Sequence, residues 1–410
     1  MNRAAAPPPQ VDIAVVGGGI LGLAVARELL IRHPDVKLAV LEAEDRLAAH
    51  QTTHSSGVIH AGVYYEPGSL RARLCVEGAA LLTAYCDERE IPWRRSGKLI
   101  VATIEEELGR LDRLEERGLA NGVPGLARIP ADRISEIEPA ATGLSALHSP
   151  NTGIVDYGLV ADSFAADVER TGGTIHLSAK VESVRSGHGS GPGRLAIETA
   201  RGGLMASRAV FCGGLQSDRL ARMAGGDPAP RIVPIRGGYL KVKAGREDLV
   251  RGNIYPVPDP ELPFLGAHLT RTFDGSLLIG PTAMLAGARD AYRLSRVRPR
   301  DLLTTLSWPG TWRLVGRNPG ATFDEIRHSV SPRALVEEAQ LMVPSLRIED
   351  VEPGPSGIRA QALGRDGKLI EDFLIERTEA AVHVRNAPSP AATSSLALAR
   401  LIADESESAG

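Results

Sequence analysis

The chain has 410 residues, of which 43% are hydrophobic and 24% are charged. This balance is close to the average of globular proteins and excludes a disordered or collagen-like chain. At roughly 100–200 residues per domain the length predicts two or three domains, and the formal net charge of −3 gives no global attraction to nucleic acid.

Cysteine content and the first residues bear on the compartment. The three cysteines form no disulfide framework and no metal-ligand motif, which suits a reducing compartment. No apolar run approaches the roughly 18–20 residues that a membrane span needs. Residues 1–10 lack both the apolar core of a signal peptide and the length of a transit segment. We therefore expect a bacterial cytoplasmic protein, with peripheral contact at the inner membrane as an alternative, and disordered ends at residues 1–10 and 403–410.

The first sixty residues predict one βαβ unit. Residues 11–16 are a continuous apolar run, typical of a strand buried on both faces. A helix is expected over residues 20–33, ended by Pro34, and a second buried strand over residues 37–41. Strands joined by such a helix pair in parallel. Residues 50–68 then form a long polar, glycine-rich loop, and loops of that length are usually functional.

Farther along, helices alternate with strands and then give way to a turn-rich region. The predicted elements are helices over 69–90, 104–117 and 161–171, and strands over 98–103, 174–184 and 208–214. Residues 235–345 mix short strands with turns rich in Pro, Gly and Asp, which favours an antiparallel sheet. The predicted fold class is α/β, with a second domain built on a mainly antiparallel sheet.

A dinucleotide-binding signature follows the first strand. Gly17, Gly19 and Gly22 have the spacing G-x-G-x-x-G, and Glu42 follows 20 residues beyond Gly22. Gly17 permits the tight turn, Gly19 lets the backbone approach a pyrophosphate, and Gly22 lets helix and strand pack closely. Glu42 is expected to bind a ribose. The signature predicts a Rossmann-type domain without separating NAD from FAD. The long loop after Glu42 favours FAD, which must be held throughout turnover.

Five further blocks of sequence carry a family resemblance. They are HQTTHSSGVIHAGVYY at residues 50–65, YPVPDP at 255–260, FLGAHLTR at 264–271, GPSGIRAQ at 354–361 and HVRNAPSPAATSS at 383–395. The chain resembles the L-2-hydroxyglutarate oxidase/dehydrogenase family, within the D-amino-acid-oxidase-like group of FAD-dependent oxidoreductases. The resemblance implies an enzyme that oxidises L-2-hydroxyglutarate to 2-oxoglutarate by hydride transfer from C2 to flavin N5. Quinone or oxygen would accept the electrons.

The resemblance also implies how two domains divide the chain. A discontinuous Rossmann-type FAD-binding domain takes residues 11–80, 150–228 and 350–405. The substrate-binding domain takes residues 81–149 and 229–349.

Implied FAD contacts lie in four segments besides the glycine motif. They are Thr53, Ser55, Ser56 and Gly57 in the long loop, Gly213 in a strand-end glycine pair, Gly357, and Pro390, Ala391 and Thr393. The last three precede a short apolar helix, whose N-terminal amides would stabilise the anionic reduced ring.

Two histidines in the family blocks are candidate bases for the hydroxyl proton, because imidazole titrates near neutral pH. They are His60 and His268, and the resemblance does not rank them. His60 is equally open to the roles of flavin-ring neighbour or attachment point. His383 is expected to organise the C-terminal segment.

The substrate has two carboxylates and so needs fixed cations. Arg359 lies in a Gly-Ile-Arg segment similar to the Gly-x-Arg segment that carries the substrate carboxylate in related oxidases, and the resemblance implies that Arg359 binds one carboxylate in bidentate geometry. The other substrate-binding candidates are Tyr64, Tyr255 and Thr270, with Tyr65, Lys98 and Arg271 as weaker candidates for the second carboxylate. We expect no metal.

Other activities compete with this interpretation. A neighbouring FAD-dependent amino-acid or amine oxidase, or a glycerol-3-phosphate dehydrogenase, would share the glycine motif, the Gly-x-Arg segment and the C-terminal loop. A flavoprotein without catalytic activity and an NAD-dependent dehydrogenase are the remaining alternatives.

Overall fold

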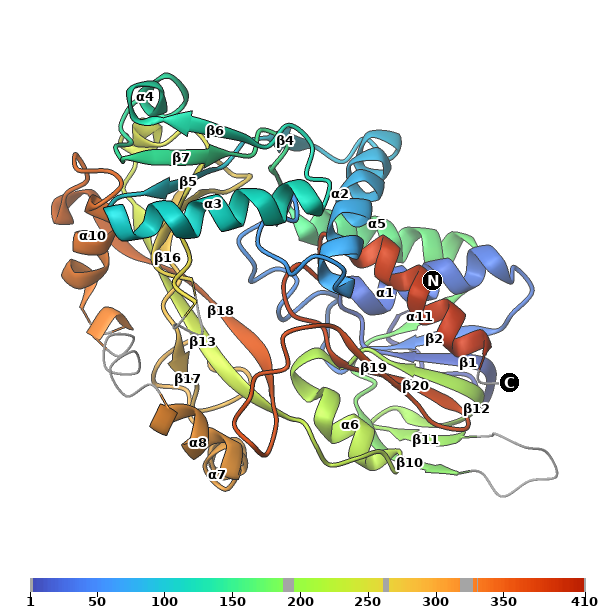
Figure 1. Cartoon of the computed structure of the whole chain (residues 1–410). Coiled ribbons are helices and arrows are strands. Elements are labelled where there is room, and N and C mark those ends of the chain that lie inside the picture. The colour runs from blue at the N-terminus through green and yellow to red at the C-terminus, as the bar shows by residue number, and fades with distance from the viewer. Residues whose placement is uncertain (1–2, 187–194, 261–264, 318–326, 330, 409–410) are drawn as a thin grey trace.

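The computed structural model describes residues 3–186, 195–260, 265–317, 327–329 and 331–408. Within them the backbone forms two large sheets covered by helices, and a third sheet of three strands (Figure 1).

The first sheet has eight strands and is centred on the apolar run at the start of the chain. Strand β1 (Gln10–Val16) lies between β12 (Gly202–Phe211) and β2 (Leu38–Leu41) and is parallel to both. The remaining strands are the parallel β9 (Thr174–His176) and β20 (Ala381–Asn386) and the antiparallel β10 (Val181–Ser186), β11 (Leu195–Thr199) and β19 (Leu374–Arg377). The predicted βαβ unit is therefore present.

Both faces of this sheet are buried, as its continuous apolar runs require. Ile13 and Val15 pack into a core with helices α1 (Ile20–Arg32), α2 (Leu70–Glu88), α5 (Tyr157–Arg170) and α11 (Ser395–Glu407). Ala14 and Val16 pack into a separate core with β10, β11 and α6 (Ser217–Met223). Successive side chains of a strand point to opposite faces, so β1 serves both cores. Figure 1 shows α1, α5 and α11 gathered above the strands.

The second sheet has nine strands and is antiparallel except where β14 pairs with β5. Its order is β17 (Met284–Leu285), β13 (Arg231–Val242), β16 (Leu277–Gly280), β15 (His268–Arg271), β14 (Asn253–Pro256), β5 (Leu99–Ala102), β7 (Ser145–His148) and β6 (Ala127–Pro130), with β18 (Val351–Leu363) beside β13. Helix α3 (Glu105–Ala120) packs in the core on one face, and α10 (Pro332–Gln340) packs in the core on the other.

The third sheet joins β3 (Val58–Ile59), β8 (Gly153–Val155) and β4 (Trp93–Arg95). The shorter helices are η1 (Ala131–Arg133), α4 (Ile134–Ile137), η2 (Gly214–Gln216), η3 (Glu247–Leu249), α7 (Pro299–Leu306), α8 (Pro309–Arg317) and η4 (Ile348–Asp350). None of the described helices combines the length and the apolar character that crossing a membrane would require.

The expected division of the chain into two domains stays a prediction, and two elements lie across or beyond its boundaries. Strand β18 pairs with β13 on both sides of one shift of register between Gly238 and Leu240, so residues 351–363 lie in the second sheet. Helix α2 runs through the expected boundary between residues 80 and 81, and its Leu82 and Cys86 pack in the core of the first sheet.

The expected disorder at the ends is corrected, because both ends pack against the first domain. Arg3 forms an ion pair with Glu169 of α5 at 2.8 Å. At the other end, α11 continues through residues 403–407, and Ile402 and Ala403 are buried. Residues 1–2 and 409–410 lie outside the described residues, as does Phe264 of the third family block.

Candidate cofactor and substrate site

The glycine motif forms the turn between β1 and α1, and its three glycines have different tasks. Gly17 has a φ of +115°, and a Cβ there would lie 2.4 Å from the carbonyl oxygen of Cys212. A Cβ on Gly22 would lie 2.0 Å from the carbonyl oxygen of Gly17. A Cβ on Gly19 would meet one neighbour, the Thr52 hydroxyl, at 3.5 Å. Gly17 and Gly22 are thus required by the turn itself, whereas Gly19 leaves the approach to the α1 N-terminus open.

The predicted ribose acid, Glu42, lies directly beside this turn. Its carboxylate is buried and accepts hydrogen bonds from the amides of Gly18 at 2.6 Å and Glu44 at 2.8 Å. Burial raises the pKa of Glu42, and the two amide hydrogen bonds oppose that rise. The Thr52 hydroxyl accepts a hydrogen bond from the first amide of α1, on Ile20, at 3.1 Å. A buried acid and a helix N-terminus with an open approach fit the ribose and pyrophosphate of a dinucleotide.

The long loop after Glu42 folds upon itself. The hydroxyl of Thr53 donates to the carbonyl of Ala48 at 2.8 Å, and that of Ser55 donates to the carbonyl of Thr52 at 3.2 Å. Gly57 has a φ of +75°, and a Cβ there would lie 2.8 Å from a backbone oxygen of β8. Ser56 is half-buried between Ser55 and Gly57.

Two other predicted glycines bring segments together. A Cβ on Gly357 would lie 2.4 Å from the carbonyl oxygen of His54, so β18 lies directly against the long loop. Gly213 faces helix α6 instead, because its Cβ would lie 2.3 Å from Leu220. Its neighbour Gly214 approaches the loop, where a Cβ would lie 2.9 Å from the Gln51 side chain.

The C-terminal segment reaches the end of the long loop. The buried Thr393 hydroxyl accepts a hydrogen bond from the His60 amide at 3.1 Å and lies 2.9 Å from the Tyr157 hydroxyl. The Ser389 hydroxyl lies 3.2 Å from Nε2 of His60, and Arg71 donates to the Ser389 carbonyl. Arg71 and Tyr157 were not predicted from the sequence, because Arg71 resembles an ordinary residue of the expected helix 69–90 and Tyr157 lies outside every expected element and family block.

The residues around the N-terminus of α11 complete this part of the site. The Pro388 carbonyl accepts from the amide of Ala391 at 2.9 Å, and the Pro390 carbonyl accepts from the amide of Ser394 at 2.9 Å. The hydroxyls of Ser394 and Ser395 are buried and have no hydrogen-bond partner within the described residues. Unpaired buried hydroxyls at a helix N-terminus fit a polar ligand.

A second group of side chains comes from the second sheet and the end of the long loop. The Lys98 ammonium lies 4.7 Å from the ring centroid of Tyr64 and 4.8 Å from that of Tyr255. Tyr255 stacks on His268 with the ring centroids 4.1 Å apart. The fully buried Thr270 hydroxyl lies 3.5 Å from the Tyr255 hydroxyl, at the limit of a hydrogen bond.

The electrostatics join the two groups into one site. Burial, together with the charges of Lys98 and Arg71 and the neighbouring His268, lowers the pKa of His60 to about 3. Burial and the charges of Arg359 and Lys98 lower the pKa of His268 to about 3. Burial lowers the pKa of Lys98 to about 8. At neutral pH the site therefore presents two neutral imidazoles among cations, which suits an anionic ligand that carries a proton to be removed.

Two sequence candidates lie elsewhere in the fold. Arg271 donates to the Val250 carbonyl and forms an ion pair with Asp248 at 3.2 Å. His383 stacks on Phe211 within the first sheet, with ring centroids 4.8 Å apart. Neither is brought to the group around Lys98. Tyr65 is buried beneath Arg71, whose guanidinium lies 4.6 Å from its ring centroid.

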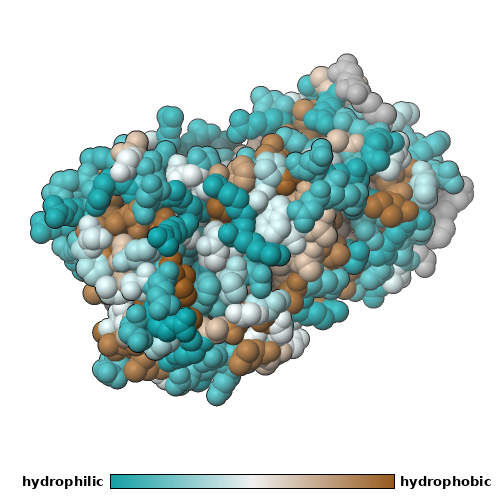
Figure 2. Space-filling view, turned by 90° about the horizontal axis from the view of Figure 1, so that it is seen from above, coloured by the Kyte–Doolittle hydropathy of each residue, from teal (hydrophilic) through white to brown (hydrophobic). Residues whose placement is uncertain are grey.

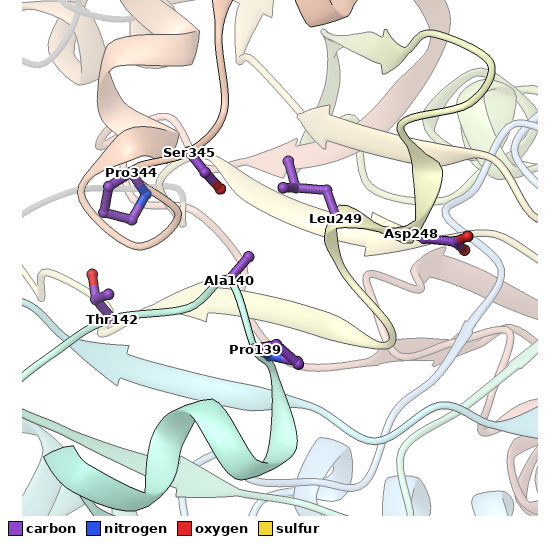
Figure 3. A pocket seen from close by; sticks show the side chains of 7 residues that line it. All are labelled: Pro139, Ala140, Thr142, Asp248, Leu249, Pro344 and Ser345. Carbon is purple, nitrogen blue, oxygen red and sulfur yellow. The ribbon is translucent and has the colours of Figure 1, made fainter.

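A surface hollow of about 480 Å³ lies away from these residues (Figure 3). Its walls come from the segment after α4, from η3 and from the segment after α10, and they contain none of the predicted site residues. The lining residues are Pro139, Ala140, Thr142, Asp248, Leu249, Pro344 and Ser345.

Comparison with known proteins places the chain in a family. A family model described as "FAD dependent oxidoreductase" matches residues 12–405. The mitochondrial L-2-hydroxyglutarate dehydrogenase of Bos taurus is 47% identical over 408 residues, covering 96% of this chain and 88% of that protein. The L-2-hydroxyglutarate dehydrogenase of Indibacter alkaliphilus is 42% identical over 388 residues, covering 94% and 96%.

Solved structures share the fold. L-α-glycerophosphate oxidase from Mycoplasma pneumoniae, with FAD bound, superposes with a TM-score of 0.78 at 22% identity, covering 97% of this chain and 95% of that chain. Glycine oxidase from Geobacillus kaustophilus superposes with a TM-score of 0.73 at 22% identity, covering 98% of this chain and 95% of that chain. The predicted fold class, the family resemblance and the FAD cofactor are confirmed. The chain therefore belongs to the FAD-dependent oxidoreductase family, which it shares with these L-2-hydroxyglutarate dehydrogenases.

Proposed function

We propose that the protein oxidises L-2-hydroxyglutarate to 2-oxoglutarate. The observation that carries the proposal is the pair of cations, Arg359 and Lys98, whose charges both act on the buried His268. A 2-hydroxy diacid offers two carboxylates and one hydroxyl proton, which matches two cations and a neutral imidazole. The names of relatives at 42% and 47% identity support the same substrate.

We assign separate roles in substrate binding and proton transfer to the residues of the site. Arg359 would bind the carboxylate next to the reacting carbon, and a neutral imidazole, His60 or His268, would take the hydroxyl proton. Bound FAD would accept the hydride from C2 at N5. Filling the site with two carboxylates would offset the nearby cations, which would raise the pKa of either histidine and make it a stronger base. His60, beside the C-terminal segment, also keeps the roles of ring neighbour or attachment point.

FAD would be held by the residues around the two helix N-termini. Gly17, Gly19, Gly22 and Glu42 would take the dinucleotide half. The long loop (Thr53, Ser55, Ser56 and Gly57), the strand-end Gly213, Gly357 of β18 and the segment with Pro390, Ala391 and Thr393 would enclose the flavin half. The buried, unpartnered hydroxyls of Ser394 and Ser395 support a polar ligand at the second of these ends.

The electron acceptor is proposed to be a quinone or oxygen, and the setting the cytoplasm with peripheral contact at a membrane. All three cysteines are free, which suits a reducing compartment. Helices α7 and α8 carry exposed Leu303 (66%) and Trp312 (60%), with the exposed arginines Arg300 and Arg313 nearby. Apolar side chains flanked by arginines are typical of surfaces that bind anionic lipid.

The face seen in Figure 2 carries apolar residues in small groups among hydrophilic ones, whereas α7 and α8 lie on the opposite side, at the bottom of Figure 1. Co-flotation with vesicles containing phosphatidylglycerol, lost in a Leu303→Ser, Trp312→Ser double variant, is the expected result. Equal flotation of both proteins would contradict the membrane proposal.

The test of the reaction is the visible spectrum of the purified protein, recorded anaerobically. We expect a yellow protein that bleaches with L-2-hydroxyglutarate and keeps its colour with D-2-hydroxyglutarate and with amino acids. Bleaching by glycine or by glycerol 3-phosphate instead would overturn the substrate assignment in favour of a neighbouring oxidase.

A further inference from the structure

We infer that Lys98 determines specificity by binding the substrate carboxylate remote from the reacting carbon. The inference rests on the proposed function and deepens it, because it selects the residue that makes the site specific for a diacid. Tyr64 and Tyr255 complete this subsite.

Lys98 is held rigidly in place. It lies immediately before β5, and its backbone exchanges two hydrogen bonds with Ser149, at 3.1 and 2.9 Å. The residue is 2% exposed, with the ammonium close to the rings of Tyr64 and Tyr255. The aromatic rings stabilise the cation by their quadrupoles but supply no counter-charge. The side chain is therefore pre-organised without being neutralised.

The comparison with the other buried cations is informative. Arg289 and Arg385 are buried to the same degree, at 2% and 1% exposure. Arg289 donates to the carboxylate of Asp218 at 2.8 Å, and Arg385 forms an ion pair with Glu376. In the described part of the chain no carboxylate lies within 4.0 Å of the Lys98 ammonium. A buried charge without a partner is costly, so the missing partner is expected to be a ligand.

The neighbouring hydroxyl fits the same ligand. The hydroxyl of Tyr64 is buried and has no hydrogen-bond partner within the described residues. Burial raises the pKa of Tyr64 well above its ordinary value, so the phenol keeps its proton and can donate. An ammonium and a phenol at one place supply two donors and a positive charge, which is the complement of a carboxylate.

The position of His268 indicates which carboxylate binds here. His268 feels the charges of both Arg359 and Lys98, and it stacks on Tyr255, which also faces Lys98. Arg359 lies on β18 two residues beyond Gly357, where that strand meets the long loop. The proposed function gives the carboxylate next to the reacting carbon to Arg359, so Lys98 is left with the distal carboxylate.

Specificity follows from this arrangement. A 2-hydroxy monoacid of the same length, L-2-hydroxyvalerate, would leave the buried Lys98 unpaired. Sites that leave a buried polar group unpaired discriminate strongly against such a substrate.

The test compares the holoenzyme with two variants, Lys98→Met and Lys98→Arg, and with the exposed-lysine control Lys180→Met. Methionine has a similar volume and no charge, so the fold should persist. For Lys98→Met we expect kcat/KM for L-2-hydroxyglutarate to fall by roughly 10- to 100-fold. The kcat/KM for L-2-hydroxyvalerate should rise, because no buried charge is then left unpaired. Lys98→Arg should keep most of the preference for the diacid. An equal fall for both substrates would overturn the inference.

A binding measurement separates this inference from the proposed function. Glutarate and valerate are titrated into the oxidised holoenzyme, and the perturbation of the flavin spectrum gives each Kd. We expect Lys98→Met to weaken the binding of glutarate by the same factor and to strengthen the binding of valerate, because the variant has no charge that valerate would leave unpaired. If Lys98→Met binds glutarate with the wild-type Kd, the proposed role of Lys98 is overturned, whether or not the enzyme turns over L-2-hydroxyglutarate. A wild-type protein that binds glutarate through Lys98 but is not reduced by L-2-hydroxyglutarate overturns only the proposed function.

Discussion

At the scale of single residues, the site is governed by cations placed beside neutral groups. Lys98 is the group there that titrates near neutral pH, because burial lowers its pKa to about 8. The groups that face it do not titrate in that range. The pKa values of His60 and His268 are about 3, and burial raises those of Tyr64 and Tyr255 above their ordinary value. Cys75 also keeps its proton in that range, because burial raises the pKa of its thiol to about 12.

The lowered pKa of Lys98 predicts that kcat/KM falls on the alkaline side of its pH profile. Below pH 8 the ammonium is protonated and holds a carboxylate, and above it the neutral amine does not. We therefore expect kcat/KM for L-2-hydroxyglutarate to fall as pH rises through about 8. The pH dependence of kcat/KM reports the pKa values of the free enzyme. Lys98→Arg should move this fall to higher pH, because a guanidinium stays charged. An identical fall in both proteins would assign it to another group.

Arg359 and Arg271 form a matched pair, since both were candidates from the sequence and the structure brings only Arg359 to the site. For Arg359→Ala we expect normal flavin content and a KM for the hydroxy acid raised by roughly 10- to 100-fold, because a charge-assisted bidentate contact is lost. Arg271→Ala should leave KM unchanged, since Arg271 pairs with Asp248. Steady-state kinetics with the flavin-to-protein absorbance ratio checks both. A normal KM in Arg359→Ala would exclude it as the carboxylate ligand.

The sequence located most candidate residues but not their ranking. His60, His268, Tyr64 and Tyr255 stand in recognisable blocks, and the structure brings them together. Lys98 was one weak candidate among several, because burial and the absence of a carboxylate partner cannot be read from a sequence. Arg71 resembles a solvated helix residue in sequence, and only the fold places Ser389 beside it.

At the scale of elements, the β1–α1 turn separates folding from cofactor binding within one motif. Gly19→Ala should fold normally, because its Cβ would meet only an ordinary contact at 3.5 Å. It should lose FAD affinity, because the side chain would occupy the approach to the helix N-terminus. Gly22→Ala should instead destabilise the apoprotein by about 1–3 kcal/mol or more, because its Cβ would overlap the Gly17 carbonyl.

Urea unfolding of the apoproteins and titration with FAD distinguish the two effects. Two outcomes would contradict the different roles of these glycines. One is a Gly19→Ala apoprotein as unstable as the Gly22→Ala apoprotein, and the other is a Gly19→Ala protein that binds FAD as tightly as the wild type.

Periodicity predicted helices α1, α2, α3 and α5, but it did not predict α6, α7, α8, α10 or strand β18. The expected helix over residues 69–90 is α2, from Leu70 to Glu88, and Ser69 caps it by accepting from the Ala72 amide. Strand β18 was not recognised, because Pro353, Gly354 and Pro355 look like a turn. Its pairing partner β13 lies more than a hundred residues earlier, and a shift of register between Gly238 and Leu240 lets the strand continue past that segment. Long-range pairing of this kind leaves no local signal.

At the scale of the whole molecule, the site exists only because the two sheets are fixed against each other. The long loop and the C-terminal segment belong with the first sheet, and Lys98, Tyr255, His268 and Arg359 belong to the second or adjoin it. No stretch of sequence contains the site, so only the family resemblance could assemble it in advance.

A buried ion pair joins the two parts near the crossing from one sheet to the other. Asp218 of α6 accepts from the Ile232 amide at the start of β13, and it pairs with Arg289, which follows β17, at 2.8 Å. Both side chains are at most 5% exposed. Arg289→Met would leave the Asp218 carboxylate buried without its cation, so we expect the free energy of unfolding to fall by about 3–5 kcal/mol.

The double variant Arg289→Met, Asp218→Asn should recover part of that loss, because it leaves no buried charge while the asparagine oxygen still accepts from Ile232. The exposed pair Arg133–Glu136 supplies the control, since both side chains are about 60% exposed and Arg133→Met should change stability by less than about 1 kcal/mol. Urea unfolding of the holoenzymes measures all three. If Arg289→Met were no more harmful than Arg133→Met, this ion pair would not be what holds the two sheets together. The spacing between Arg359 and Lys98 would then not depend on this pair.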